Sequence, residues 1–300
     1  MNKQKRNVPR GTFLFLSFLS DNLSVILDTE RMIQMKIGFN LSNETSENQP
    51  MPTQTATTTE PVKSLVDVYF PESDVKFPYY NDSFDLHKGD LVYVDGKFEG
   101  EKGRVVAVYY TFKINLDHYK RVVHKINTTV KGELFFANGH MISFERDVIP
   151  KQKLTSWFLP PQADEVITVE DTSATFYPLH ELNKIPVPDH IIERGEEYYM
   201  ENRVVYVEID GEKGYAIVDG TKPYELEFSY RNGTVTLPLC PCFCSGTCKH
   251  QVALLLQLRE TIDLIESDYK DKFDGYFALL QRDAFFSITS FKNKSSLVLK

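Results

Sequence analysis

The chain has 300 residues, of which 42% are hydrophobic, and its formal net charge is −8 at pH 7. This length exceeds the usual size of one domain, and the apolar content suffices for more than one core, so we expect two folded units. The acidic balance, with a pI near 5.5, repels phosphate. It excludes nucleic-acid binding through the charge of the whole chain, so any such contact needs a local basic patch.

The amino-terminal segment places four basic residues at positions 3–10 before the apolar residues 13–19. This is the order found in a secretory signal peptide. The apolar run is only about seven residues long, contains Ser17, lacks a small-residue cleavage site and is far too short to span a bilayer. An alternative is that translation starts at Met32 or Met35. We therefore expect a cytoplasmic protein without membrane association.

Residues 41–61 are rich in Ser, Thr, Asn, Gln and Pro and have almost no large apolar side chains. Such a segment cannot bury enough surface to order itself. We assign residues 1–63 to a disordered or mis-assigned leading segment and linker. The two folded units are then expected at residues 64–160 and 161–300.

The first unit is predicted to consist of short strands separated by turns that glycine marks. The predicted strands are residues 65–70, 89–94, 103–110, 134–136 and 141–144. Several short strands with such turns favour a small β-barrel-like unit. The segment from Lys88 to Val105 loosely resembles the SH3- and OB-like barrels that bind nucleic acids or proteins. Trp157, which follows these strands, is interpreted as part of the core rather than as a stacking platform.

The second unit is predicted to contain a β-meander, then a Cys/His cluster at residues 240–250, then a helix. The meander strands are residues 204–209, 215–218, 224–230 and 234–237, separated by Asp-Gly and Asn-Gly turns. The helix starts at residues 248–250 and carries an apolar stripe. The stripe consists of Val252, Leu255, Leu256, Ile262 and Ile265. Residues 260–283 are also expected to be helical. The fold class is therefore α+β, mostly β.

All four cysteines of the chain lie within nine residues, and a histidine follows two residues later. In a reduced compartment, Zn²⁺ holds thiolates at about 2.3 Å in a tetrahedron that an imidazole can complete. The pattern therefore predicts a zinc site. The alternatives are a disulfide framework or a reactive thiol group, but a disulfide reading ignores the histidine and requires an oxidising compartment.

Five candidate ligands compete for four positions. The set Cys240, Cys242, Cys248 and His250 leaves a five-residue loop, whereas replacing Cys240 with Cys244 leaves a tighter loop of three. We prefer the first set and keep Cys244 as the alternative ligand. Four protein ligands leave no open position for water, so the predicted zinc site is structural rather than catalytic.

These residues resemble the SWIM zinc finger, whose signature is Cys-x-Cys, a variable loop and Cys-x-His, followed by an apolar helix. Upstream, Arg194-Gly195-x-x-Tyr198 resembles the leading segment of bacterial members. The resemblance covers about residues 186–262 and includes the Gly220 and Gly233 positions. It implies a structural zinc finger that binds proteins or nucleic acids, with a SWI/SNF-type ATPase, encoded separately, as a partner.

Known catalytic motifs match this sequence poorly, and we expect that the protein is not an enzyme. His180-Glu181 begins like a metalloprotease helix, but Lys184 stands where the second histidine is needed. Pro241-Cys242-x-Cys244 resembles half of a zinc-deaminase motif, but its spacing is one residue short.

Protein interaction is the preferred role, and direct DNA or RNA binding through a local basic patch is the alternative. The candidate nucleic-acid contacts are Lys113, Lys120, Arg121, His124, Lys125, Lys131, Arg203 and Lys249. Scattered, solvated charges are the competing interpretation of these residues.

Overall fold

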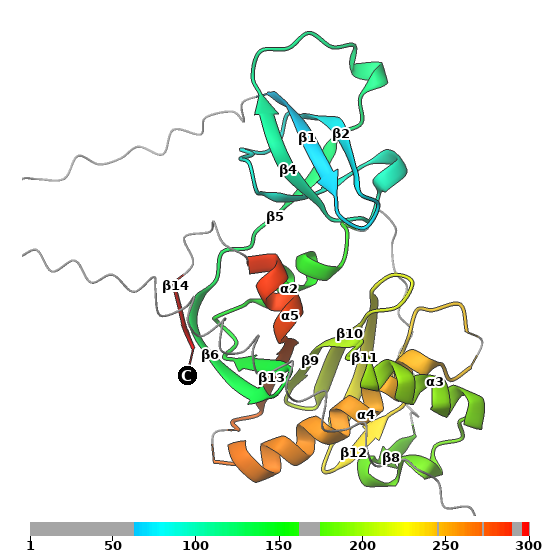
Figure 1. Ribbon diagram of the computed structural model, residues 1–300. Coiled ribbons are helices and arrows are strands. Elements are labelled where there is room, and N and C mark those ends of the chain that lie inside the picture. The colour runs from blue at the N-terminus through cyan, green and yellow to red at the C-terminus, as the bar shows by residue number, and fades with distance from the viewer. Residues whose placement is uncertain (1–62, 162–174, 245, 272, 290–295, 300) are drawn as a thin grey trace, which may run out of the picture. The chain divides into compact units, whose positions relative to one another are not determined.

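The computed structural model describes residues 63–161, 175–244, 246–271, 273–289 and 296–299 (Figure 1). More of the described residues lie in strands than in helices, which confirms the α+β, mostly β class. None of the described helices is long and apolar enough to cross a membrane. The signal-peptide-like segment and the polar linker lie outside the described residues.

The smaller sheet is antiparallel and has the strand order β2-β1-β4-β3-β5. Its strands are β1 (Ser64–Phe70), β2 (Val75–Asn81), β3 (Leu91–Val94), β4 (Gly103–Tyr109) and β5 (Val122–Ile126). Alternate residues of β1 are buried, as its alternating apolar sequence predicts. Two 3-10 helices, η1 (Gly96–Phe98) and η2 (Leu116–His118), follow β3 and β4.

This sheet does not close into a barrel. Its edge strands, β2 and β5, meet only through one bridge, between Tyr80 and Arg121. The sequence pattern predicts neither edge strand. β2 contains Pro78, which removes a hydrogen-bond donor and is tolerated on an edge strand. β5 is short and half polar, so its pattern is weak.

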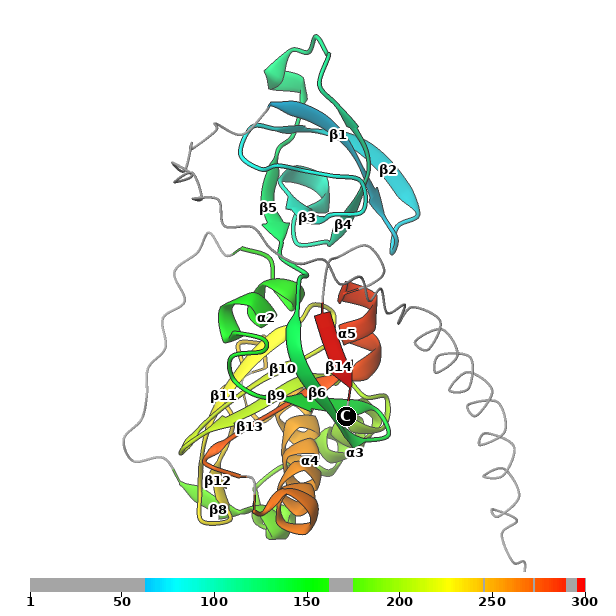
Figure 2. The same ribbon diagram turned by 90° about the vertical axis from the view of Figure 1, so that its left-hand side faces the viewer.

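The larger sheet has the order β14-β6-β7-β13-β9-β10-β11-β12-β8, and only the β14–β6 pair, seen side by side in Figure 2, is parallel. The strands that precede the meander in the sequence are β6 (Lys131–Asn138), β7 (Met141–Phe144) and β8 (Phe176–Pro178). The meander strands are β9 (Val204–Asp210), β10 (Lys213–Val218), β11 (Tyr224–Arg231) and β12 (Thr234–Thr236). The last two are β13 (Tyr276–Gln281) and β14 (Ser296–Leu299). The meander is confirmed at nearly the predicted boundaries.

The chain passes from the smaller sheet to the larger sheet before residue 160. β6 and β7 pair with each other, and β7 pairs with β13 of the larger sheet. The change from one sheet to the other therefore lies between β5 and β6. The strand pattern of residues 134–144 was correct, but a pattern does not specify which distant strand it pairs with.

Helices cover both faces of the larger sheet. One face packs on α4 (Lys249–Leu264), whose Leu254, Leu255 and Leu258 share a buried cluster with Val207 of β9. The other face packs on α2 (Lys151–Phe158) and α5 (Arg282–Thr289). Burial on both faces explains why β9 and β10 read as nearly continuous apolar runs.

Trp157 of α2 is fully buried, as predicted, and its Nε1 donates a hydrogen bond to the carbonyl of Asn127 over 2.8 Å. Its ring lies 6.2 Å from that of Phe285 on α5. The core interpretation of this residue is therefore confirmed.

The prediction that residues 260–283 are helical is wrong in its second half. α4 continues as a π-helical turn, η4 (Ile265–Tyr269), but Tyr276–Gln281 is strand β13. This strand is central to the larger sheet and pairs with β7 and β9. The gain from pairing and burial there outweighs the local helical preference of Ala278 and Leu279.

Helix α3 (Asp189–Met200) packs closely on the first turn of α4, and Gly195 makes this approach possible. A Cβ at Gly195 would lie 2.4 Å from the Cβ of Val252 and 3.3 Å from the carbonyl of Lys249. The 3-10 helix η3 (Leu179–Lys184) precedes α3 and contributes the buried Leu179. The packing of α3 on α4 places the end of α3 beside the Cys/His cluster.

Candidate metal centre

The preferred ligand set converges in space. The ligand atoms of Cys240, Cys242, Cys248 and His250 all lie within 4.8 Å of one another. The Nδ1 atom of His250 is 3.8 Å from the Sγ of Cys240 and 3.7 Å from the Sγ of Cys248. A tetrahedral zinc site with ordinary bond lengths has ligand–ligand distances of about 3.5–3.8 Å. The four side chains therefore fit one tetrahedral metal ion with little movement.

Two elements supply the ligands as two pairs. The chain leaves β12, and Leu239 then pairs with Glu227 of β11, its N–H donating to the Glu227 carbonyl over 2.8 Å. Cys240 and Cys242 follow this fixed point. The second pair comes from the start of α4, where Cys248 is the N-cap residue and His250 is in the first turn. A strand end and a helix start thus face each other, as the sequence predicted.

Gln251, which was not among the predicted site residues, connects the two pairs. Its Oε1 accepts a hydrogen bond from the Cys248 N–H over 2.6 Å, and its Nε2 donates to the Pro238 carbonyl over 2.5 Å. One buried side chain therefore fixes both the helix start and the backbone before Cys240. The sequence does contain a signal for this role, because glutamine at the third helical position is the reciprocal half of a capping box.

His250 is held between two tyrosine rings and is only 5% exposed. The ring centroid of Tyr224, on β11, lies 4.5 Å from that of His250, and the Tyr198 ring, at the end of α3, is edge-on at 5.5 Å. The Nε2 edge faces Gly220, where an added Cβ would lie 2.9 Å away. These contacts orient Nδ1 toward the three sulfur atoms.

The thiols share protons unequally. The hydrogen bond with Cys240, and after it the one with His250, lowers the pKa of Cys248 to about 4. The same pairing with Cys248, together with burial, raises the pKa of Cys240, while burial raises the pKa of Cys242. One thiolate is therefore favoured and two thiols retain protons. A bound cation would displace those protons, which is the ordinary coupling between metal binding and thiol ionisation.

Cys244 lies outside the cluster. Its side chain is exposed, and the neighbouring Phe243 is fully exposed, at 101% of its reference area. All four cysteines are described residues with free thiols, so the disulfide alternative is not formed. The geometry selects Cys240 over Cys244 as the fourth member of the group.

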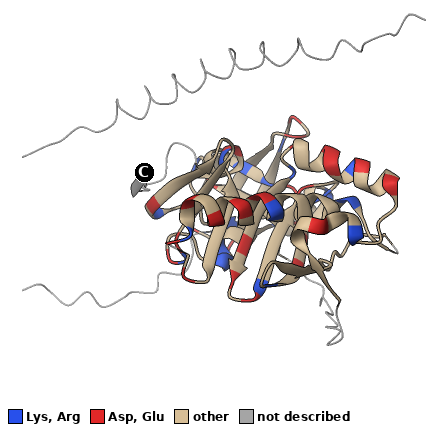
Figure 3. Ribbon diagram, turned by 90° about the horizontal axis from the view of Figure 1, so that it is seen from below, with Lys and Arg blue, Asp and Glu red and all other residues tan. Residues whose placement is uncertain are grey.

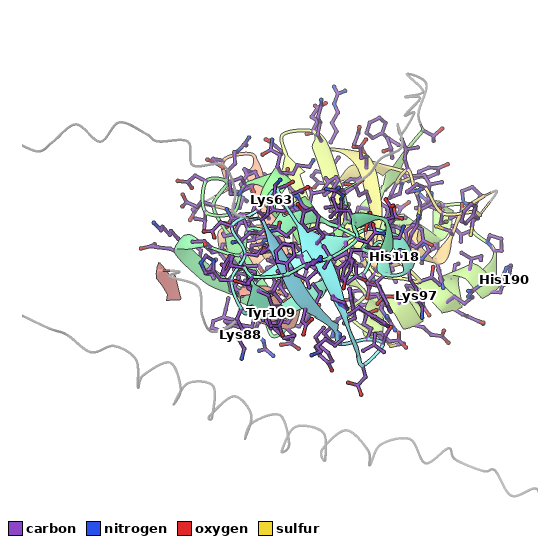
Figure 4. All side chains as sticks on the ribbon, turned by 90° about the horizontal axis from the view of Figure 1, so that it is seen from above. Lys63, Lys88, Lys97, Tyr109, His118 and His190 are labelled. Carbon is purple, nitrogen blue, oxygen red and sulfur yellow. The ribbon has the colours of Figure 1, made fainter. Side chains whose placement is uncertain are left out.

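Several of the basic candidates already pair with carboxylates of the protein. In the part of the chain that the structure describes, Lys and Arg positions are interspersed with Asp and Glu (Figure 3). Arg121 pairs with Asp82, and Lys125 pairs with Asp90 over 2.8 Å. Lys113, Lys120, His124 and Lys131 are on β5, on β6 or beside η2, whose exposed His118 is labelled in Figure 4.

Near the cluster, Arg203 and Lys249 both contact the ring of Tyr198. The Lys249 ammonium is 4.1 Å from the ring centroid, and the Arg203 guanidinium is 5.7 Å from it. Arg203 also pairs with Glu201 over 3.0 Å and with Asp219 over 3.6 Å. These cations already have partners within the protein, so their net attraction for phosphate is reduced.

Comparisons with protein-family models, with curated proteins and with solved structures find no match.

Proposed function

We propose that this protein binds one zinc ion in a structural, SWIM-type centre formed by Cys240, Cys242, Cys248 and His250. The single observation that carries the proposal is the convergence of these four ligand atoms within 4.8 Å. Three thiolates and an imidazole are borderline-soft ligands that suit tetrahedral zinc better than calcium or magnesium, which prefer oxygen ligands.

The positions that carry the SWIM resemblance support this assignment, because they surround His250. Gly195 allows α3 to approach α4, Tyr198 packs on the imidazole, and Gly220 leaves room beside Nε2. In the sequence these residues are 30 or more positions away from His250. Their shared location explains in physical terms why they accompany a Cys-x-Cys and Cys-x-His pair.

We propose a non-catalytic role for the centre. A complete set of four protein ligands leaves no coordination position for substrate or water. The metal would instead join the end of the meander to the first turn of α4, and its binding free energy would act as folding energy.

The proposed purpose of the finger is protein interaction. Leu239 is 50% exposed and Phe243 is fully exposed, and both lie within one residue of a ligand. An ion that fixes this loop would present two apolar side chains at low entropic cost, which favours binding to another protein. By resemblance, a SWI/SNF-type ATPase encoded separately is the proposed partner, with this chain as the adaptor.

The partner is tested by purifying the tagged full chain from its native host, with zinc and after chelation. We expect a SWI/SNF-type ATPase to co-purify with the chain only when zinc is present. The Phe243→Ser variant should no longer co-purify with this ATPase. Tyr110→Ser is the matched control, because Tyr110 follows the end of β4 directly and is 57% exposed. If the chain instead retards labelled DNA in a salt-dependent manner that requires Lys120, Arg121 and Lys125, direct nucleic-acid binding replaces the adaptor role.

A further inference from the structure

A second feature, apart from the cysteine cluster, is a cavity of about 540 Å³ beside β7 and β13. Its volume falls in the range of small-ligand sites. The lining residues come from β6, β7, the segment after β7, η4, the segment between η4 and β13, and the start of β13. They are Phe135, Ser143, Phe144, Glu145, Arg146, Asp147, Tyr269, Phe273, Asp274, Tyr276 and Phe277.

Six aromatic rings line this cavity, and they come from segments far apart in the sequence. Tyr269 packs edge-on against Phe277, with ring centroids 5.4 Å apart, and its hydroxyl donates to the Phe136 carbonyl over 2.9 Å. Tyr269, Phe273 and Tyr276 are only partly buried. The wall is therefore fixed by internal contacts and still has ring surface available to a ligand.

The charges of the cavity are mainly negative. Glu145, Asp147 and Asp274 are exposed carboxylates in the lining, and Arg146 is the single cation of the lining. Arg146 is neutralised by Asp210, because both of its terminal nitrogens donate to that carboxylate over 2.7 Å. The remaining field at the cavity therefore favours a positive ligand.

Arg146 also shows which contacts a cation makes at this wall. Its guanidinium lies 4.6 Å from the ring centroid of Tyr276 while it pairs with Asp210. An aromatic face together with a carboxylate is the environment that organic cations prefer, because the negative face of the ring and the negative carboxylate both attract a positive charge. The lining holds further rings and carboxylates of the same two kinds.

We propose that this cavity binds an organic cation, with a guanidinium group as the best fit. The aromatic rings would contact the planar faces of the group, and the carboxylates would accept its N–H donors. The proposal does not depend on zinc, so the two sites are tested separately.

The test is titration of the full chain with N-acetyl-arginine amide and, as a neutral probe of the same shape, with N-acetyl-citrulline amide. We expect the arginine probe to bind with a millimolar dissociation constant, measured by calorimetry or NMR. The citrulline probe should bind about tenfold more weakly, or weaker still. Equal binding of both probes, or no binding of the arginine probe, would overturn the proposal.

Variants connect the binding to the cavity. Phe273→Ala removes a partly exposed ring, and Asp147→Asn removes one exposed charge, so each should weaken binding of the arginine probe several-fold. Asp117→Asn is the matched control, because it makes the same charge change at η2 and should have no effect. Thermal unfolding of each variant verifies that it is folded. Unchanged affinity in folded Phe273→Ala would also contradict the proposal.

A peptide arm distinguishes a free cation from a side chain. Gly-Gly-Arg-Gly-Gly should bind more tightly than the amide if the natural ligand is an arginine in a protein, and equally if it is a small molecule. Both outcomes support the cation site and identify its source.

Discussion

Cys248→Ser should cause the largest loss of stability of any single change at the cluster. Cys248 is 1% exposed, is the N-cap of α4 and lies beside His250. Replacing the sulfur removes a ligand that a hydroxyl does not replace, so the proposed zinc ion would be lost along with the folding energy that it would supply. We expect the free energy of unfolding to fall by more than about 4 kcal/mol, measured by urea denaturation.

The same experiment distinguishes loss of metal from loss of packing. The unsubstituted protein, treated with a strong chelator, should shift to nearly the same urea midpoint as Cys248→Ser. Adding zinc back should restore the unsubstituted protein and leave the variant unchanged. A chelated protein as stable as the zinc-treated one would contradict a structural role for the metal.

Gly220→Ala should weaken zinc binding without changing any ligand. An added Cβ would lie 2.9 Å from the Nε2 of His250 and 3.0 Å from the ring of Tyr224. The imidazole cannot rotate away, because Tyr198 packs against it as well. Gly220 does not have a positive φ, so this glycine is required for space rather than for its backbone conformation.

We expect zinc affinity to fall by about 10- to 100-fold in Gly220→Ala, which is the usual effect of disturbing the residues behind a metal ligand. The measurement is competition with a chelator of known affinity. Gly246→Ala is the matched control, because an added Cβ there has nothing within 4 Å. Equal affinities for the two variants would show that the position of His250 does not control the site.

The ligand group was predictable because its signal is local. Four cysteines and a histidine within eleven residues specify a metal cluster by residue type and spacing alone. Loop length also favoured Cys240 over Cys244, and the structure places Cys240 rather than Cys244 in the cluster. Likewise, the Asp-Gly and Asn-Gly turns of the meander determined its strand boundaries closely.

The surroundings of His250 required the structure. Tyr198 and Gly220 precede His250 by tens of residues, and only the packing of α3 on α4 and the end of β10 bring them together. The helix prediction for the residues of β13 was wrong for a related reason, because the sequence of Tyr276–Gln281 is compatible with either helix or strand. Its position between β7 and β9 decides the matter, and that pairing is not encoded locally.

The metal content per chain of the full-length protein, purified under reducing conditions, tests the central claim most directly. It should be compared with His250→Ala and with Cys244→Ser. The account predicts about one zinc per chain in the unsubstituted protein and in Cys244→Ser, and its loss in His250→Ala. Absence of zinc from all three proteins, or loss in Cys244→Ser with retention in His250→Ala, would contradict a centre formed by Cys240, Cys242, Cys248 and His250.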